Sequence, residues 1–392
     1  MTGGKRLREL HGGNIYRFAE ELDMDEKEVV DFSASINPLG ISKKVKSALI
    51  KNIRYLINYP DPDATELRQH LSKHYHINVD SILCGNGSTE LIYLIPRALK
   101  PEKVLIPQPT FSEYERACRT ASYKLQVTSY KLKQENNFEI DTDAFIKAMK
   151  GCDMAFLCNP NNPTGRLLKR AAMLKIAGAA KKLRCYLVVD EAFIDFCPKD
   201  SVVNEVCDNP YLIVLRSMTK FYALTGLRIG YGVFHQSVIK KIISYKEPWT
   251  VNTIAQRAGV VAMSDIEYRD KTFSVIKQEK KFMEDSFGKL RIDYIPSAVN
   301  YYLIRLNNAG EVIHSLSDKE ILVRDCSNFA GLNRKYIRIA VKSRKDNMRL
   351  LKELSNFLDV IPAKAGIQKT NKLDSASSTL RSSATAEDGS AE

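Results

Sequence analysis

The sequence predicts an α/β fold with a mostly parallel central sheet sandwiched by helices, and a smaller α/β domain toward the C-terminus. In the middle of the 392-residue chain, short apolar runs alternate with stretches of helical pattern. Runs that are apolar almost without interruption are typical of strands buried on both faces, as in parallel sheets covered by helices. The last third contains a second, shorter set of strands flanked by helical stretches, which predicts the smaller domain.

The strands of the large sheet are predicted from the apolar runs, taken in order along the chain. Helical stretches lie between most of these runs, for example Arg170–Leu183. An earlier helix is expected to begin after Asp63, which can cap it, and Glu66 can complete a capping box. The predicted strands are Ser81–Cys84, Val104–Ile106, Met154–Cys158, Tyr186–Val189, Leu212–Leu215 and Ile229–Phe234.

The smaller domain and the two chain ends complete the predicted organisation. We expect residues 1–55 to pack with the smaller domain and over the functional site, 56–265 to form the large domain, and 266–361 the smaller one. Residues 362–392 are rich in Ala, Ser and Thr, so we expect a disordered tail. The strands predicted in the smaller domain are Tyr301–Leu306, Ile321–Arg324 and Tyr336–Val341, and the helices are Val275–Leu290 and Asn347–Leu358.

The composition, with 44% hydrophobic and 27% charged residues, is that of a soluble globular protein. The formal net charge is +13, but the basic residues are scattered, so we expect anionic small molecules to be compatible partners and nucleic acid not to be one. No apolar run suits a membrane span or a signal peptide. The eight Cys and six His show no metal-type spacing, so we expect no metal and a cytoplasmic location.

Polar motifs follow the ends of successive predicted strands, where ligands bind in open parallel sheets. Residues 85–90 read Gly-Asn-Gly-Ser-Thr-Glu, in which glycines let the backbone approach an anion and a helix N-terminus supplies free N–H groups. This segment predicts a phosphate site, although an ordinary capped turn has the same pattern. Residues 159–165 read Asn-Pro-Asn-Asn-Pro-Thr-Gly, a rigid loop that can present the amide of Asn162.

Three charged side chains are predicted at buried positions. Asp190 ends an apolar strand and needs a cationic partner, which could be a protonated ring nitrogen or an arginine. Lys220 lies just beyond another strand, where desolvation lowers the pKa of an amine and leaves a nucleophile, and Ser217 and Arg228 could hold a phosphate near it. Arg338 interrupts a third strand, so its partner is a carboxylate ligand or an internal salt bridge.

These motifs, in this order, resemble the fold-type I pyridoxal-phosphate enzymes of the aminotransferase superfamily, from about His11 to Leu358. The resemblance implies that Lys220 holds the cofactor as a Schiff base and that Asp190 pairs with its pyridinium nitrogen. Tyr59 matches a tyrosine that reaches the neighbouring subunit's cofactor phosphate, which implies a homodimer with shared active sites. The other implied roles are Asn162 for the phenolic oxygen, Phe111 for stacking, Gly87, Ser88, Thr89, Ser217 and Arg228 for the phosphate, and Arg338 for the substrate α-carboxylate.

One position departs from the family pattern, and three segments narrow the branch. Phe193 stands where many aminotransferases have a tyrosine, so one hydrogen bond to the cofactor oxygen is lost. Residues 11–16, 31–40 and 321–329 resemble the threonine-phosphate decarboxylases of cobalamin biosynthesis, which are similar to histidinol-phosphate aminotransferases. The resemblance implies decarboxylation of L-threonine O-3-phosphate to (R)-1-amino-2-propanol O-2-phosphate, with transamination of histidinol phosphate by 2-oxoglutarate as the alternative.

Both of these substrates carry a phosphate monoester, so a second anion site is required beside the one for the cofactor phosphate. We expect Arg324 to supply its main cation. His11, Ser35 and Asn37 are expected to add hydrogen bonds if the N-terminal segment folds over the site. Threonine phosphate and serine phosphate differ by one methyl group, and no residue in the sequence decides between them.

Overall fold

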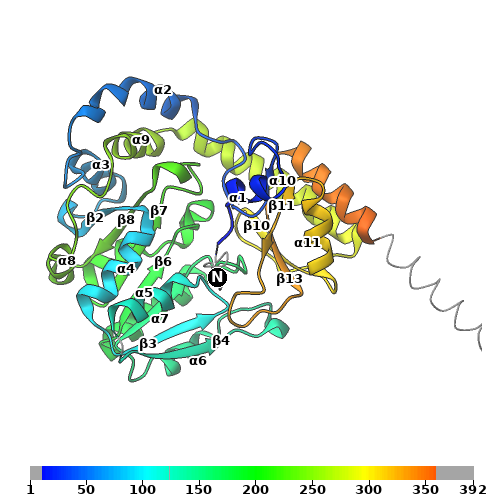
Figure 1. Ribbon diagram of the computed structural model, residues 1–392. Helices are drawn as coiled ribbons and strands as arrows, with labels where there is room; N and C mark the ends of the chain where they lie inside the picture. Colours follow the sequence, from blue (N-terminus) through cyan, green and yellow to red (C-terminus); the bar gives the residue numbers. More distant parts are fainter. Residues whose placement is uncertain (1–10, 123, 359–392) are drawn as a thin grey trace, which may run out of the picture.

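The computed structural model describes residues 11–122 and 124–358 (Figure 1). The predicted tail, 362–392, lies outside these described residues. Within them, no helix is long and apolar enough to cross a membrane. The same part of the chain holds no group of three or more His, Cys, Asp or Glu residues suited to a metal ion.

A seven-stranded sheet forms the centre of the large domain, in the order β2-β8-β7-β6-β5-β3-β4. The five strands from β7 to β4 in this order run parallel, whereas β8 is antiparallel to both of its neighbours. This confirms the predicted mostly parallel sheet. The strands are β2 (Ile82–Asn86), β3 (Lys103–Gln108), β4 (Gln126–Lys131), β5 (Met154–Cys158), β6 (Tyr186–Asp190), β7 (Leu212–Ser217) and β8 (Ile229–Phe234).

Helices cover both faces of this sheet, and alternate residues of each strand enter two different cores. Val189 of β6 and Val214 of β7 lie in one core, whereas Val188 and Leu215 lie in the other. The first core is packed by α2 (Lys43–Asn52), α3 (Thr65–Tyr75), α6 (Thr142–Ala148), α7 (Arg170–Leu183) and α9 (Thr253–Met263). The second is packed by α4 (Gly87–Leu99), α5 (Glu113–Ala121) and α8 (Gln236–Ile243).

The start of α3 differs from the prediction. Asp63 does not cap the helix, because the carboxylate of Asp61 accepts the Thr65 N–H at 2.7 Å and also the Asp63 N–H. Glu66 does not close a capping box but forms an ion pair with Arg257 of α9. The side chain that caps α3 therefore comes from Asp61, four residues before Thr65. Between them, Ala64 takes the left-handed conformation at φ 49°.

The small domain is built on a four-stranded antiparallel sheet in the order β12-β13-β10-β9, of which Figure 1 labels β10 and β13. The predicted strand at 321–324 is split at Val323: β11 (Ile321–Leu322) pairs with β1 (Val30–Asp31), while Arg324 opens β12. The N-terminal segment is thereby joined to the small domain. The remaining elements are α1 (Ile15–Glu21), α10 (Ile266–Leu290), β9 (Asp293–Tyr294), β10 (Tyr301–Arg305), α11 (Ala309–Ser317), β12 (Arg324–Asp325), β13 (Tyr336–Ala340) and a helix over 344–358.

Short 3-10 turns connect many of these elements. Two of them, η4 and η5, follow the carboxyl end of β6, and η7 precedes β8. The 3-10 helices are η1 (Ile53–Ile57), η2 (Val79–Ser81), η3 (Gln134–Asn136), η4 (Ile194–Phe196), η5 (Pro198–Asp200), η6 (Val203–Asp208) and η7 (Thr225–Leu227).

Candidate active site

A cavity of about 810 Å³ lies at the carboxyl ends of the parallel strands, where it is also lined by the N-terminal segment and the small domain. This is the edge of the sheet at which an open α/β fold binds ligands. The structure brings most of the predicted site residues to this one cavity. Those lining it are His11, Ser35, Ser88, Thr89, Phe111, Asn162, Asp190, Ser217, Lys220, Arg228, Arg324 and Arg338.

Lys220 follows β7 and lines the cavity, and its side-chain amine forms no hydrogen bond or ion pair within the described residues. Burial lowers the pKa of its amine to about 8, and the positive charges of Arg338 and Arg228 add to the effect. The backbone carbonyl of Lys220 accepts the Asn37 N–H at 3.1 Å, which ties the lysine segment to the N-terminal segment. A neutral, positioned amine is therefore accessible near neutral pH.

Asp190 ends β6 and is buried at the cavity wall. Its carboxylate accepts hydrogen bonds from the Tyr114 hydroxyl at 2.8 Å and from the Ala192 N–H at 3.0 Å, and it forms no ion pair within the described residues. Burial raises the pKa of Asp190, whereas those two hydrogen bonds and the charge of Lys220 lower it. The sequence left open an arginine as the cationic partner of Asp190, and within the described residues no arginine pairs with it.

At the expected phosphate site, the backbone at the start of α4 packs closely against the side chain of Arg228. Gly87 opens α4 at φ +71°, and a Cβ at this position would come within 2.6 Å of the Arg228 Nη2 atom. At Gly230 an added Cβ would come within 2.4 Å of the Ser88 N atom. Ser217 shares a hydrogen bond of 2.7 Å with Thr219 next to this site. Gly87 therefore lies beneath the guanidinium rather than at the cavity wall, and the α4 N-terminus is held close to it.

Arg338 projects from β13 into the cavity and lies over the ring of Tyr301 at 5.1 Å. It donates hydrogen bonds to the Asn162 side-chain oxygen and, at 2.7 Å, to the Ser33 carbonyl. Its Nε atom is buried without a partner, and within the described residues the partners of Arg338 are neutral groups rather than a carboxylate. The internal salt bridge that the sequence allowed is therefore absent from this part of the chain, and the guanidinium keeps its charge for a ligand.

A second cationic position is formed by Arg324 on the small-domain side of the cavity. The guanidinium is buried, donates to the Asn328 side-chain oxygen at 2.8 Å and lies over the Phe329 ring at 5.2 Å. Near it, the Nε2 atom of His11 lies 2.9 Å from Glu113, and burial lowers the pKa of this histidine despite that carboxylate. The hydroxyl of Ser35 is buried in the cavity wall without a hydrogen-bond partner.

Besides Gly87, two predicted residues do not reach the cavity. The Asn37 amide donates to the Phe221 carbonyl at 2.7 Å and to the Thr272 hydroxyl at 2.8 Å, and its oxygen accepts the Leu39 N–H. Its hydrogen-bonding capacity is used within the chain, so the structure does not support the expected contact of Asn37 with a substrate. Tyr59 is 84% exposed and lies outside this cavity.

Sequence reasoning missed several residues at the site. Tyr114 is fully buried, donates a hydrogen bond to Asp190 and stacks on Phe156. Glu113, also buried, bonds both His11 and the hydroxyl of Tyr93. Both lie at the start of α5, directly after the predicted aromatic at 111. Polar residues there would have been a usable signal, because a helix N-terminus at a strand end is close to the ligand site.

The fold and the cavity are those of a pyridoxal-phosphate enzyme of the aminotransferase type, and comparison with known proteins agrees. The family model "Aminotransferase class I and II" matches residues 27–354, and the chain belongs to this family. It is similar to the threonine-phosphate decarboxylase of Salmonella typhimurium, with 38% identity over 353 residues, covering 89% of this chain and 96% of that protein.

Solved structures of related enzymes show the same similarity. The histidinol-phosphate aminotransferase from Clostridium acetobutylicum is 31% identical, with a TM-score of 0.78 and coverage of 84% of this chain and 98% of the other. The L-threonine-O-3-phosphate decarboxylase from Porphyromonas gingivalis is 29% identical, with a TM-score of 0.73 and coverage of 84% and 99%. The predicted resemblance is therefore confirmed, and the two branches that the sequence indicated are both represented among the relatives.

Proposed function

We propose that this chain is a pyridoxal-phosphate-dependent decarboxylase that converts L-threonine O-3-phosphate to (R)-1-amino-2-propanol O-2-phosphate in cobalamin biosynthesis. Four arginines line the cavity, and the observation that carries the proposal is that three of them, Arg228, Arg324 and Arg338, are buried or half-buried there. The fourth, Arg116, is half exposed and lies 3.7 Å from Glu113. Three anionic groups would match Arg228, Arg324 and Arg338: the cofactor phosphate, the substrate phosphate and the substrate carboxylate. The similarity to the Salmonella threonine-phosphate decarboxylase supports the same substrate.

The residues present fit pyridoxal phosphate. Asp190 is a buried carboxylate without a cationic partner in the described residues, which a protonated ring nitrogen would supply. Lys220 offers an amine with a lowered pKa for the aldehyde, and Phe111 offers a ring at the cavity wall for stacking. The phosphate would be held by Ser88, Thr89, Ser217 and Arg228 around Gly87, and Asn162 would bond the phenolic oxygen.

The roles of the chain's own residues in the reaction follow from this placement. When bound, the cofactor supplies an electron sink for the bond broken at the substrate Cα. Arg338, fixed by Asn162 and Ser33, holds the carboxylate, while Arg324 with His11 and Ser35 holds the substrate phosphate. These two anchors orient the Cα–carboxylate bond. After carbon dioxide leaves, the Lys220 amine is the group that can deliver a proton to Cα.

Cofactor attachment is expected to depend on pH through Lys220. Burial, Arg338 and Arg228 lower the pKa of its amine to about 8, and only the neutral amine attacks an aldehyde. The rate at which the cofactor-free protein takes up pyridoxal phosphate should therefore rise about tenfold per pH unit below pH 8 and level off above it. Stopped-flow absorbance between pH 6.5 and 10 measures this rate. A rate that keeps rising to pH 10 would indicate an ordinary lysine.

Replacement of Arg324 by methionine should weaken substrate binding more than turnover. The phosphate lies away from the reacting carbon, so its anchor contributes similarly to the ground and transition states, and we expect KM to rise about 10-fold to 100-fold. Arg116→Met is the matched control, because Arg116 lines the same cavity but is half exposed and lies 3.7 Å from Glu113. Equal KM values for the two variants would remove Arg324 from the phosphate site.

The decisive assay compares the two branches. The cofactor-loaded protein is incubated with threonine phosphate, and separately with histidinol phosphate plus 2-oxoglutarate. Carbon dioxide release in the first mixture supports the proposal. Glutamate formation in the second without gas in the first would identify a histidinol-phosphate aminotransferase, which the 31% identity to the Clostridium acetobutylicum enzyme makes the second candidate.

We also propose a homodimer with shared active sites. Exposed apolar side chains gather around η1, where Ile53, Leu56 and Ile57 are 57%, 58% and 90% exposed. Tyr59 follows directly, and its ring contacts that of Trp249, which is half exposed. A second copy covering this surface would remove the apolar groups from water and place Tyr59 in the partner's site. Light scattering should give twice the chain mass, and Ile57→Asp should lower that value.

A further inference from the structure

Glu191 and Arg216 lie at the ends of β6 and β7, on the face of the sheet opposite the active-site cavity. Side chains alternate between faces along a strand. Val189 and Val214 enter the core beneath α3, α7 and α9, so the next residues of the same parity, Glu191 and Arg216, continue that face. Asp190, between Val189 and Glu191, points to the other side and lines the active-site cavity. Glu191 is thus next to Asp190 in the sequence, and Arg216 is next to Ser217. Both charged side chains, however, lie on the opposite face of the sheet from these site residues.

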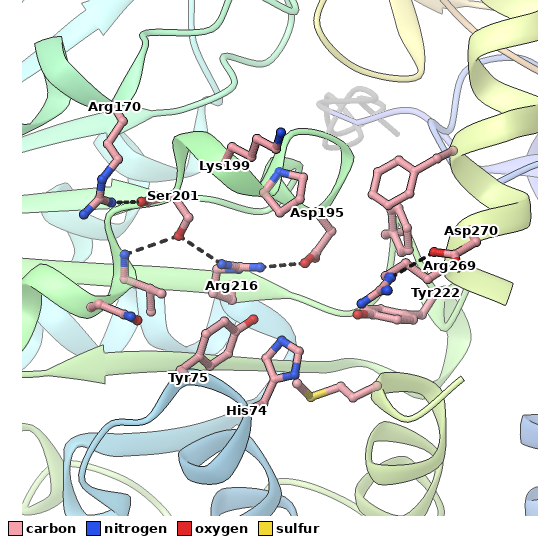
Figure 2. A pocket seen from close by; sticks show the side chains of 16 residues that line it. His74, Tyr75, Arg170, Asp195, Lys199, Ser201, Arg216, Tyr222, Arg269 and Asp270 are labelled. Carbon is pink, nitrogen blue, oxygen red and sulfur yellow. Dashed lines mark hydrogen bonds and ion pairs between the residues drawn. The ribbon is translucent and has the colours of Figure 1, made fainter. Parts of the chain in front are cut away.

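The two charges belong to a largely buried network. The Arg216 guanidinium donates to Glu191 at 3.1 Å and to Asp195 at 2.6 Å, and the second of these bonds is drawn in Figure 2. Glu191 also accepts the Ser201 hydroxyl at 2.6 Å and the Val202 N–H at 2.8 Å. The side chains of Arg216 and Glu191 are only 3% and 0% exposed. We call Glu191, Asp195, Ser201 and Arg216 the ion-pair clamp.

The ion-pair clamp joins three neighbouring strands. Arg216 lies over the ring of Tyr75 at 5.3 Å, and the Tyr75 hydroxyl shares a hydrogen bond of 2.7 Å with that of Tyr231 in β8. Tyr231 is paired with Arg216 in the sheet register. Figure 2 shows three members of the clamp, Arg216, Asp195 and Ser201, at a second cavity of about 480 Å³. The carboxyl ends of β6 and β7 and the amino-terminal half of the antiparallel strand β8 are therefore held together from the side away from the active site.

A contribution to the stability of the fold does not by itself explain why such a buried ion-pair network is present. Removing two charges from water is unfavourable, and well-packed apolar residues of similar volume are often as stabilising as a buried ion pair. An ion pair does, however, fix the relative position of the two groups that it joins. Here it fixes the strand end that carries Asp190 against the one that carries Ser217 and, three residues later, Lys220. The backbone agrees, because the Glu191 N–H donates to the Leu215 carbonyl at 2.8 Å.

We propose that the ion-pair clamp sets the relative placement of Asp190 and Lys220 toward the cofactor, so that Glu191 and Arg216 are positioning residues for the active site. The inference rests on the proposed function, since it requires that the chain bind pyridoxal phosphate. Neither residue lines the active-site cavity. The effect of Glu191 on Asp190 is transmitted by one peptide unit, and that of Arg216 on Lys220 by residues 217–219.

The test uses the cofactor-loaded full chain and two readouts besides activity: the dissociation constant for pyridoxal phosphate and the pH midpoint of its visible absorbance. In Glu191→Gln we expect the dissociation constant to rise roughly 10-fold to 100-fold, as for other residues that orient a ligand-holding group. The absorbance midpoint should shift as well. Arg216→Lys keeps the charge without the forked geometry and should give an intermediate result.

A double variant separates positioning from folding. Glu191→Leu with Arg216→Met replaces the ion pair by apolar residues, so the cofactor-free protein should unfold near the wild-type temperature while cofactor binding is weakened as in Glu191→Gln. Glu279→Gln is the matched control: this buried carboxylate pairs with Arg344 at 3.0 Å in the small domain, and its loss should leave both readouts unchanged.

The outcomes are distinct. If the double variant folds and keeps the wild-type dissociation constant and absorbance midpoint, the clamp is only structural and the inference is wrong. If Glu279→Gln changes both readouts to the same degree, the effect is a general loss of stability and the inference is likewise overturned. If the wild-type protein itself does not bind pyridoxal phosphate, it is the proposed function that fails.

Discussion

Lys220→Ala is expected to abolish the visible absorbance of the cofactor-loaded protein and to lower turnover by roughly ten-thousand-fold or more, as when a covalent catalytic group is lost. The reason is that Lys220 is the amine at the cavity wall whose pKa is lowered to about 8, by burial first and by Arg338 and Arg228 next. Without it the aldehyde has no attachment point and Cα has no nearby proton donor. Absorbance spectroscopy after gel filtration measures the first effect, and carbon dioxide release the second.

Lys280 provides a matched control for this variant. Burial also lowers the pKa of its amine to about 8, but the amine donates to the Ser297 and Val299 carbonyls in the small domain and does not reach the cavity. Lys280→Met should therefore keep the absorbance band. A band that survives in Lys220→Ala, or that is lost equally in both variants, would show that a lowered amine pKa alone does not identify the attachment site.

The fold was largely predictable because its strands carry a strong local signal. The apolar runs at β5, β6 and β7 are buried on both faces, so nearly every residue in them is apolar and the strand bounds agree within one or two residues. The edge strand β4 was missed, because only Val127 and Tyr130 are half-buried and its other four residues are exposed, so it contains no apolar run. Strand pairing across the chain, as between β1 and β11, has no local signature at all.

The site was predictable where a motif ties a residue to a strand end, and not where long-range packing decides its role. Asp190 and Lys220 directly follow buried runs, so the sheet alone brings them to one edge. Asn37 belongs to a motif too, but its partners Phe221 and Thr272 are about 200 residues away in the sequence, and their bonds take its amide from the cavity. Tyr114 is the opposite of Asn37: it was not predicted at the site, and only the folded chain shows that it donates a hydrogen bond to Asp190.

Asp190→Asn is expected to lower turnover by about a thousandfold to ten-thousandfold while the cofactor stays bound, similar to other buried aspartates that hold a ring nitrogen in the required protonation state. The near-isosteric amide removes the charge that would keep the cofactor's ring nitrogen protonated. Asn can still bond the Ala192 N–H and the Tyr114 hydroxyl, so the local geometry should persist. Steady-state decarboxylation rates and the absorbance spectrum measure the two parts of this prediction.

The same substitution should stabilise the cofactor-free protein. Burial raises the pKa of Asp190, so the folded state disfavours the charged carboxylate. A carboxyl group whose pKa is raised in the folded state lowers the stability of the protein as the pH rises from the group's usual pKa near 4, and this loss continues up to the folded pKa. Asparagine avoids this penalty, so the cofactor-free variant should be more stable by about 1 kcal/mol at pH 7 and no more stable at pH 3.

Tyr114→Phe tests whether the charge or the hydrogen bond matters. It removes the 2.8 Å bond to Asp190 but leaves the carboxylate and the stacking on Phe156, so turnover should fall by only about tenfold. If Asp190→Asn and Tyr114→Phe reduce turnover equally, the carboxylate acts through its local hydrogen bonds and not through its charge. If Asp190→Asn destabilises the cofactor-free protein at pH 7, groups of the folded chain stabilise the charge of the Asp190 carboxylate. The cofactor's ring nitrogen is then no longer needed to explain why this carboxylate is buried.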